Sequence, residues 1–439
     1  MKLSKYIQKI ENNENVVLYN SINHAIVELP SEAFSGDELN NDLDNEAINA
    51  LSEMGYLSIS DSNIAESLRT YLVNEDKLFI SVELNLSCNL RCPYCYQSGS
   101  HNGQIIEDSV IDNIIEYIKK VHSKIGYKEL FIKVLGGEPS LVWKKFLRLY
   151  NGVLAVCKSH GIKFNLLIDT NGTKIADFLT LSDYDSLLFT IPLSYKNSHD
   201  AVRFDAKGNG TYDLIINNIN ELKKAKPDVK IVIRYNVDHN NIQYFNDFLK
   251  DISDKLVFKP LISINYTAEL AAEENYDNKL SYRDFLDWCS SSAIDSLIEA
   301  NLPITISPII SVEECQFRSR YSLKVFSDGT AGSCAMSFFN KNKDLLSCIV
   351  KEFCNDDMAF WKDKNKQTIM SDNECLNCDS LFLCGGTNKL PCIKALDHDL
   401  CKDKIFSVNL NKFILRYLQQ REQNNGSLFV VFENGESYR

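Results

Sequence analysis

The distribution of cysteine is the feature that most constrains this chain. Its 439 residues include 14 Cys, of which three lie at 88–95 and nine at 315–401. Cys157 and Cys289 stand apart, each in an apolar helical pattern that predicts a buried thiol. The N-terminus has no apolar segment of signal-peptide length. Clustered thiols without a secretion signal indicate a cytoplasmic metal or iron–sulfur protein rather than a disulfide scaffold.

Composition excludes several other classes. An apolar fraction of 44% is too high for a disordered chain. The 47 Lys and Arg against 59 Asp and Glu give a net charge of −12, which argues against binding to nucleic acid or to an anionic membrane surface. No apolar run reaches the ~18 residues that a membrane-spanning helix needs. We therefore expect a folded protein with neither a nucleic-acid nor a membrane partner.

Residues 79–300 alternate between strand-like and helical patterns. The apolar runs that predict strands lie at 80–86, 130–135, 164–169, 187–193, 230–237 and 257–266. Helical stripes follow, for example over 107–122, 212–222 and 282–298. Such alternation predicts a parallel sheet with right-handed crossovers. Six units are too few for a closed eight-fold barrel, so the fold class is α/β with a partial (β/α)6 TIM-like barrel. Functional residues should lie at the carboxyl ends of its strands.

The barrel is flanked by three other regions. Residues 1–78 contain no Cys and predict a hairpin over 16–20 and 25–29, followed by helices over 46–54 and 64–73. This is a small unit of winged-helix size. Residues 301–405 are rich in Cys and poor in regular patterns. Residues 406–439 complete a helix that begins near 405 and end with an apolar run over 428–432.

The first cysteine cluster follows the first predicted strand of the barrel. Cys88, Cys92 and Cys95 have the spacing C-x3-C-x2-C. Three thiolates this close can hold three irons of a [4Fe–4S] cube and leave the fourth iron open for chemistry. The alternative is a zinc knuckle, which would need a fourth ligand from elsewhere in the chain.

With Tyr94 as its aromatic residue, this motif resembles the signature of the radical S-adenosylmethionine (SAM) enzymes. The resemblance implies that the open iron chelates the amino and carboxylate groups of SAM. One electron then cleaves SAM to methionine and a 5′-deoxyadenosyl radical, which abstracts hydrogen from a substrate. The family also implies a flavodoxin- or ferredoxin-type reductant. The protein's part is orientation and exclusion of side reactions.

A second match ends the second predicted strand. Gly136, Gly137, Glu138 and Pro139 resemble the family's GGEP motif, which binds the SAM amino group. Two glycines allow the backbone to approach a ligand closely, and Glu138 offers a carboxylate to an ammonium group.

Weaker matches end the next two strands. Thr170 and Asn171 resemble the family's TNG segment, whose polar side chains face the SAM ribose. Ser194 and Arg203 match the family's S-x-D-G and H-D-x-x-R segments, and a guanidinium suits the SAM carboxylate. Tyr195-Lys196 replaces the D-G of relatives, so no role is carried over from that Asp.

The C-terminal cysteines resemble the SPASM extension of peptide-modifying radical SAM enzymes. By position, Cys315, Cys334 and Cys392 would bind a first auxiliary [4Fe–4S] cluster, and Cys375, Cys378, Cys384 and Cys401 a second. Cys392 departs from the pattern in its spacing, because seven residues separate it from Cys384 where relatives have three. Cys348 and Cys354 are candidates for the remaining ligand, unless that iron stays open for a substrate thiolate. Two zinc sites are the alternative.

The N-terminal unit bears on the choice of substrate. It is similar in size and pattern to the winged-helix element with which peptide maturases bind a precursor's leader, although it could instead be a structural cap. The resemblance is to the synthases of sactipeptides, ranthipeptides and streptide. It implies an enzyme that installs a thioether or carbon–carbon cross-link in a ribosomally synthesised peptide.

Two alternatives remain open from the sequence. One is an anaerobic sulfatase-maturating type enzyme, which forms formylglycine. The other is a non-catalytic electron carrier or zinc scaffold. The sequence identifies no catalytic base.

Overall fold

The computed structural model describes most of the barrel and the N-terminal unit. The described residues are 1–40, 43–58, 76–95, 97, 103–266, 278, 280–305, 321–332, 374, 377–384, 405–423, 430–431 and 437–438. The helix expected over 64–73 lies outside them, as do Cys315, Cys334, Cys348, Cys354, Cys375, Cys392 and Cys401. Within the described residues, no helix is both long enough and apolar enough to cross a bilayer.

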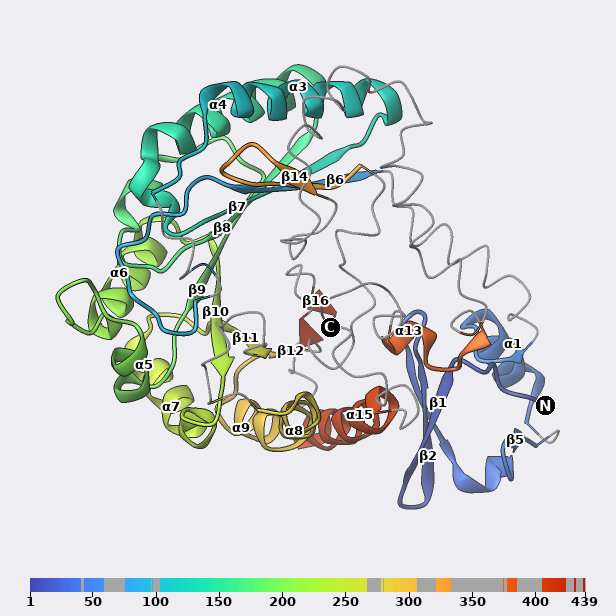
Figure 1. Ribbon diagram of the computed structural model, residues 1–439. Helices are drawn as coiled ribbons and strands as arrows, with labels where there is room; N and C mark the ends of the chain where they lie inside the picture. The colour runs from blue at the N-terminus through green and yellow to red at the C-terminus, as the bar shows by residue number, and fades with distance from the viewer. Residues whose placement is uncertain are drawn as a thin grey trace.

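The barrel sheet contains the six strands expected from the sequence. They are β6 (Lys77–Glu83), β7 (Glu129–Leu135), β8 (Lys163–Asp169), β9 (Ser186–Pro192), β10 (Lys230–Val237) and β11 (Leu261–Tyr266). Each strand pairs in parallel with the next in chain order. Figure 1 shows them as a curved, open sheet with helices along its outer side. The α/β class and the partial barrel are therefore confirmed.

The helices between the strands form the outer layer. They are α3 (Asp108–Ile125), α4 (Trp143–His160), α5 (Lys196–Val202), α6 (Tyr212–Ala225), α7 (Phe245–Lys255), α8 (Tyr282–Trp288) and α9 (Ile294–Glu299). A π-helical turn, Cys289–Ala293, joins α8 to α9. Both isolated cysteines are buried, Cys157 in α4 and Cys289 in this turn, as predicted. On β7, Leu130, Ile132 and Val134 are at most 1% exposed, so the alternate residues face the barrel's inner side.

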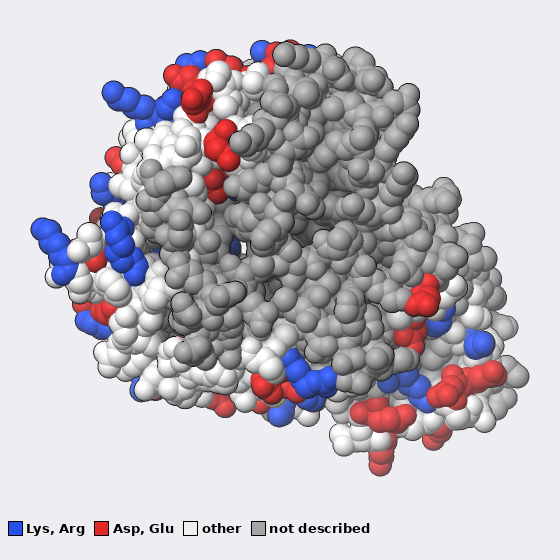
Figure 2. Space-filling model, viewed as in Figure 1, with Lys and Arg blue, Asp and Glu red and all other residues white. Residues whose placement is uncertain are grey.

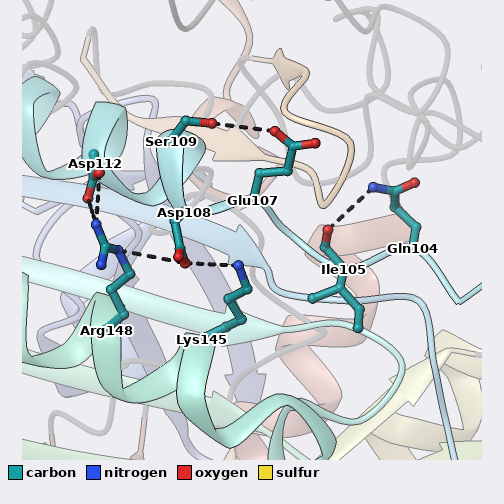
Figure 3. A network of polar contacts seen from close by, with 8 residues as sticks. All are labelled: Gln104, Ile105, Glu107, Asp108, Ser109, Asp112, Lys145 and Arg148. Carbon is teal, nitrogen blue, oxygen red and sulfur yellow. Dashed lines mark hydrogen bonds and ion pairs between the residues drawn. The ribbon is translucent and has the colours of Figure 1, made fainter.

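Charged side chains of both signs are interspersed over the described surface of the outer layer, as Figure 2 shows for one face. Figure 3 shows one such group, which ties the first turns of α3 to α4. Lys145 Nζ lies 2.8 Å from Asp108 Oδ1, and Arg148 Nη2 lies 2.7 Å from Asp112 Oδ1. These side chains are exposed or partly exposed, so solvent screens each pair and the pairs add little to stability.

The sheet continues beyond its first strand. β13 (Leu323–Val325) pairs in parallel with β6, and β14 (Ala331–Gly332) pairs antiparallel with β13. We did not predict these strands, because two or three residues are too few to produce a periodic pattern. Residues from the cysteine-rich region thus lie against the strand that leads to Cys88.

The N-terminal unit is an antiparallel sheet with one helix beside it. The sheet order is β1 (Ile7–Asn12), β2 (Asn15–Asn20), β3 (Ile26–Pro30), and the helix is α1 (Asn45–Glu53). A short hairpin of β4 (Phe34–Ser35) and β5 (Glu38–Leu39) follows β3. The predicted β2–β3 hairpin and helix α1 are confirmed. β1 was missed because its buried residues, Ile7 and Ile10, are spaced as in a helix.

C-terminal elements connect this unit to the barrel. α15 (Ile405–Gln423) contacts β1 and α9, and α13 (Leu381–Cys384) contacts α15. The ring of Tyr6 packs edge-on against that of Phe382 in α13, with centroids 4.9 Å apart. β12 (Ile304–Thr305), β15 (Val430–Val431) and β16 (Ser437–Tyr438) form a further small sheet. The predicted C-terminal helix and terminal strand are both present.

Candidate functional site

The loop after β6 brings three free thiols to the carboxyl end of the barrel. Cys88, Cys92 and Cys95 are all partly exposed, and Cys92 lies close enough to Cys88 and Cys95 to contribute to raising the pKa of both. The Cys95 amide donates to the Cys92 carbonyl at 3.1 Å, and the Leu90 amide to Cys88 Sγ at 3.4 Å. Burial raises the pKa of Cys88, and it raises that of Cys95 to about 11. Thiols that are reluctant to ionise alone become good ligands once a metal replaces the proton.

The two glycines after β7 are required by a close backbone approach. The Gly137 amide donates to the Asn85 carbonyl at 2.9 Å, and the Glu138 amide to that of Ser87 at 2.8 Å. A Cβ on Gly136 would lie 2.5 Å from the Asn85 oxygen, and one on Gly137 2.2 Å from the Ser87 oxygen. We expected the glycines to admit a ligand. Among the described residues, what they admit is the segment that leads into Cys88.

Glu138 joins this segment to the one after β8. Its carboxylate is fully buried and accepts hydrogen bonds from Thr170 Oγ1 at 2.9 Å, the Asn171 amide at 2.8 Å and the Ser140 amide at 3.1 Å. Burial raises the pKa of Glu138, and these hydrogen bonds oppose that rise. No cationic side chain of the described residues pairs with it. A buried carboxylate held this way can accept an ammonium group from a ligand.

Asn171 extends the connection to the cysteine loop. Its Nδ2 donates to Asn89 Oδ1 at 2.8 Å and lies 3.7 Å from Cys88 Sγ. Asn89 in turn donates to Thr173 Oγ1 at 2.8 Å. The ends of β6, β7 and β8, predicted separately from the sequence, therefore meet around Cys88.

Arg203 approaches the same loop from the end of α5. Its side chain is 5% exposed, and Nη1 donates to the Tyr94 hydroxyl at 3.0 Å. The Arg203 Nε is buried without a hydrogen bond among the described residues. The next residue, Phe204, accepts a hydrogen bond from the Arg91 amide at 2.9 Å. An orphaned guanidinium donor beside three thiols is the donor that a ligand carboxylate would complete.

β9 and α5 position Ser194 and the Tyr195-Lys196 pair, which replaces the D-G of the family. Ser194 is buried just beyond the end of β9. Lys196 begins α5 and pairs with Asp213 at 2.5 Å on the surface. The Tyr195-Lys196 substitution thus directs a charged side chain away from the site.

Sequence reasoning missed several residues that support the loop. Glu83, at the end of β6, accepts hydrogen bonds from Gln97 Nε2 at 2.9 Å and from Ser327 Oγ at 2.8 Å. Asn85 donates to the Glu138 carbonyl at 3.2 Å. Ser327 is 244 positions from Glu83 in the chain. No local pattern could have revealed that pairing.

Two cysteines of the C-terminal array are described. Cys378 is exposed just before α13, and Cys384 is the last residue of that helix. Across the described ranges, no three His, Cys, Asp or Glu side chains converge on a single metal-ion position.

Comparison with known proteins bears on the barrel first. Residues 82–252 match the model of the Radical SAM superfamily. A Cysteine-type anaerobic sulfatase-maturating enzyme of Clostridium novyi (strain NT) is 29% identical to this chain over 218 residues. The match covers 46% of this chain and 58% of that enzyme.

Two solved structures extend the comparison. One is anSMEcpe with bound AdoMet and the Cp18Cys peptide, at a TM-score of 0.56 and 19% identity over 80% of this chain and 99% of that one. The other is Streptococcus suis SuiB bound to S-adenosylmethionine, at a TM-score of 0.49 and 16% identity over 88% and 95%. The likeness to anSMEcpe is one of fold.

Proposed function

We propose that this chain is a radical SAM enzyme acting on a peptide, because residues 82–252 match the model of the Radical SAM superfamily. More specifically, we propose that it installs a thioether or carbon–carbon cross-link in a ribosomally synthesised peptide. One observation carries the catalytic part. The ends of β6, β7 and β8 and the Arg203 side chain converge on a single loop of three thiols.

The proposal assigns a part to each residue of this convergence. Cys88, Cys92 and Cys95 would hold three irons of a [4Fe–4S] cluster. Glu138, in the GGEP segment, would take the SAM amino group, and Arg203, with Ser194 nearby, would take its carboxylate. Thr170 and Asn171 would face the ribose. When bound, the cluster and SAM supply the one-electron cleavage that leads to hydrogen abstraction. The protein orients both groups and excludes water.

The C-terminal array would hold two auxiliary clusters. Their ligands would be the SPASM cysteines assigned by position, with Cys348, Cys354 or an open iron completing the first cluster. A flavodoxin- or ferredoxin-type partner would supply the electron. Free thiols and oxygen-sensitive clusters suit a reducing, cytoplasmic location.

The N-terminal sheet is the proposed site for the precursor's leader. β3 is an outer strand, and one side of it has no strand partner among the described residues. All five of its residues retain some exposure. An extended peptide could add a strand there through main-chain hydrogen bonds. β1, at the opposite edge, contacts α15, which leaves β3 the more accessible edge.

Formylglycine formation is the second candidate. It is favoured by the 29% identity to the Clostridium novyi enzyme and by the similar fold of anSMEcpe, which binds a peptide. The products differ chemically. A cross-link removes two hydrogens and creates no carbonyl, whereas formylglycine carries an aldehyde that a hydrazide probe captures.

Co-expression with a candidate precursor peptide followed by mass spectrometry tests the proposal. With the wild-type enzyme, we expect a peptide that has lost two hydrogens and does not react with a hydrazide. With the Cys92→Ala variant, we expect the peptide to remain unmodified. Cys157→Ala is the matched control, because that thiol is buried in α4. A hydrazide-reactive product would establish the second candidate instead.

A further inference from the structure

A charged cluster lies on the inner face of the barrel, contributed by three different strands. Lys133 lies on β7, Asp169 ends β8 and Arg234 lies on β10. Each alternates with residues buried under the outer helices, so all three point to the inner side. The side chains of Lys133, Asp169 and Arg234 are 29%, 22% and 30% exposed, respectively. The cluster is therefore accessible to a ligand inside the barrel.

The contacts within the cluster are incomplete. Lys133 Nζ lies 3.0 Å from Asp169 Oδ2, whereas Arg234 Nη2 lies 3.8 Å from the same oxygen. Arg234 makes no side-chain hydrogen bond to the part of the chain that the structure describes, and its Nε is buried. Asp169 Oδ1 is likewise buried without a partner among the described residues. Within the described part of the chain, the Arg234 guanidinium thus lacks a hydrogen-bond acceptor, and the Oδ1 atom of Asp169 lacks a donor.

The cluster carries a surplus of positive charge. Burial raises the pKa of Asp169, but the neighbouring Lys133 and Arg234 and hydrogen bonds from Lys133 and Thr190 lower it further, so the carboxyl stays ionised. Two cations then face one carboxylate. Glu83, the described carboxylate on the inner side of β6, already accepts from Gln97 and Ser327. Lys324, on β13, is a further cation and lies over the Phe326 ring.

An unsatisfied guanidinium is costly inside a protein, and a fixed one is well suited to an anion. A partly desolvated charge without hydrogen bonds loses solvation that its neighbours do not restore. Arg presents a planar set of donors that matches a carboxylate with two parallel hydrogen bonds. Asp169, whose side chain is 22% exposed, could accept a hydrogen bond from an N–H group on the same ligand. A peptide offers both groups.

The cluster lies next to the proposed reaction site. Asp169 directly precedes Thr170, which donates to Glu138, and Asn171, whose Nδ2 lies 3.7 Å from Cys88 Sγ. A group bound at the cluster would therefore hold the attached peptide beside the position proposed for SAM.

We propose that Lys133 and Arg234 bind a carboxylate of the peptide substrate, with Asp169 as their counter-ion and as the acceptor of a peptide N–H. The carboxylate belongs either to an acidic side chain or to the peptide's C-terminus. The inference rests on the proposed function only in taking the ligand to be a peptide.

Binding of matched small probes to the full-length, cluster-loaded protein tests this. N-acetylglutamate methylamide carries a side-chain carboxylate, N-acetylglutamine a main-chain carboxylate and N-acetylglutamine methylamide neither. By titration calorimetry, we expect one of the two acids to bind at least about tenfold more tightly than the neutral probe. Which acid binds identifies the source of the carboxylate. Equal binding of all three probes would overturn the proposal.

Variants assign that difference to the cluster. Arg234→Gln and Lys133→Gln should reduce acid binding to the level of the neutral probe. Arg234→Lys keeps the positive charge but loses the planar set of guanidinium donors, so it should bind the acid with intermediate affinity. It replaces Arg234→Gln in the test if that variant does not fold. Lys163→Gln is the control, since Lys163 pairs with Glu129 at the opposite end of β8. Unchanged acid binding by both cluster variants would overturn the proposal.

Binding of SAM to the Arg234→Gln variant is the last measurement of the test. We expect Arg234→Gln to leave the dissociation constant of SAM within about twofold of the wild-type value. A loss of SAM affinity as large as the loss of acid binding would mean that the cluster holds the carboxylate of SAM, and would overturn the proposal. Acid binding without modification of any peptide would instead count against the proposed function alone.

Discussion

Arg203 is the residue on which the proposed mode of SAM binding most depends. Burial alone would lower its pKa, but the nearby Tyr94 hydroxyl and the Cys88 and Cys92 thiols raise it, so the guanidinium stays charged. Its one described side-chain hydrogen bond goes to Tyr94. A buried cation with an unused donor gains most from an anionic ligand. The Tyr94 hydroxyl then acts as a positioning group that fixes the direction of the remaining donors.

Replacing Tyr94→Phe should therefore weaken SAM binding without removing the cluster. Loss of the hydroxyl leaves a buried guanidinium donor unpaired, which costs about 1–3 kcal/mol. We expect the dissociation constant of SAM to rise roughly tenfold while iron and sulfide content stay at the wild-type level. Calorimetry, together with the change in the cluster's electron paramagnetic resonance spectrum on SAM addition, measures this. Tyr150→Phe is the control, because Tyr150 donates to Ser182 away from the site. Equal SAM affinity in both variants would rule out the positioning role.

His199 should make stability depend on pH. It is fully buried, its Nε2 pairs with Thr211 Oγ1 at 3.2 Å, and burial and then Arg203 hold its pKa well below the usual value. The unfolded chain binds a proton near pH ~6.5 and the folded chain does not. The free energy of unfolding therefore falls as pH drops below that value, by up to about 1.4 kcal/mol per pH unit.

Urea denaturation at several pH values checks this expectation. His199→Gln keeps a donor for Thr211 but removes the titration, so the variant should lose that part of the slope between pH ~7 and pH ~5. His122, whose pKa is also lowered, contributes equally to both proteins and cancels in the comparison. Identical slopes would show that His199 is protonated in the folded chain or is not buried.

Among the elements, the backbone contact between the segments that follow β6 and β7 sets the position of the cysteine loop. Gly137→Ala would place a Cβ against the backbone of Ser87, which cannot move aside as a flexible side chain could. We expect a loss of about 3 kcal/mol in stability and a marked loss of bound iron. Gly161→Ala, with a φ of +66° and no neighbour within 4 Å, should cost only about 1 kcal/mol and retain iron. Comparable iron loss in the Gly137→Ala and Gly161→Ala variants would contradict a special role for this backbone contact.

The elements also show how much the sequence could predict. Strands such as β7 and β8 were predictable because each is a long apolar run between turn residues. β1 and β13 were not, since the first has helix-like spacing and the second has three residues. Short strands exist because a neighbouring strand completes them, and that information is not local.

The same contrast holds within the site. Cys88, Gly137 and Arg203 belong to motifs with fixed spacing, and the structure brings their segments together. Asn85 and Glu83 follow no motif, and their partners are 53 and 244 positions away. The proximity of Lys133 and Arg234 on the inner face of the barrel could not be predicted from the sequence, because it depends on the register of four strands.

At the scale of the whole molecule, the N-terminal unit is attached to the segment that carries Cys378 and Cys384. Tyr6 packs on Phe382 and lies in one apolar core with Leu410 of α15. Because Phe382 lies between the two cysteines, the N-terminal unit and one proposed auxiliary cluster share a packing contact.

Tyr6→Ala should therefore affect both parts of the molecule. We expect about 3 kcal/mol less stability, lower auxiliary iron content and slower peptide modification, with release of 5′-deoxyadenosine in the absence of peptide little changed. Tyr6→Phe keeps the ring and should match the wild type. Limited proteolysis and iron analysis of the two variants measure the difference. Full auxiliary iron in Tyr6→Ala would indicate that the two regions are independent.

The proposed function depends on the abstraction of hydrogen from a peptide by the radical that SAM yields. A candidate precursor peptide with deuterium at its carbon positions, incubated anaerobically with the reduced, cluster-loaded enzyme and SAM, tests it directly. We expect deuterium in the released 5′-deoxyadenosine, in step with modification of the peptide. Modification of the peptide with no deuterium in 5′-deoxyadenosine, or SAM binding without its cleavage, would contradict it.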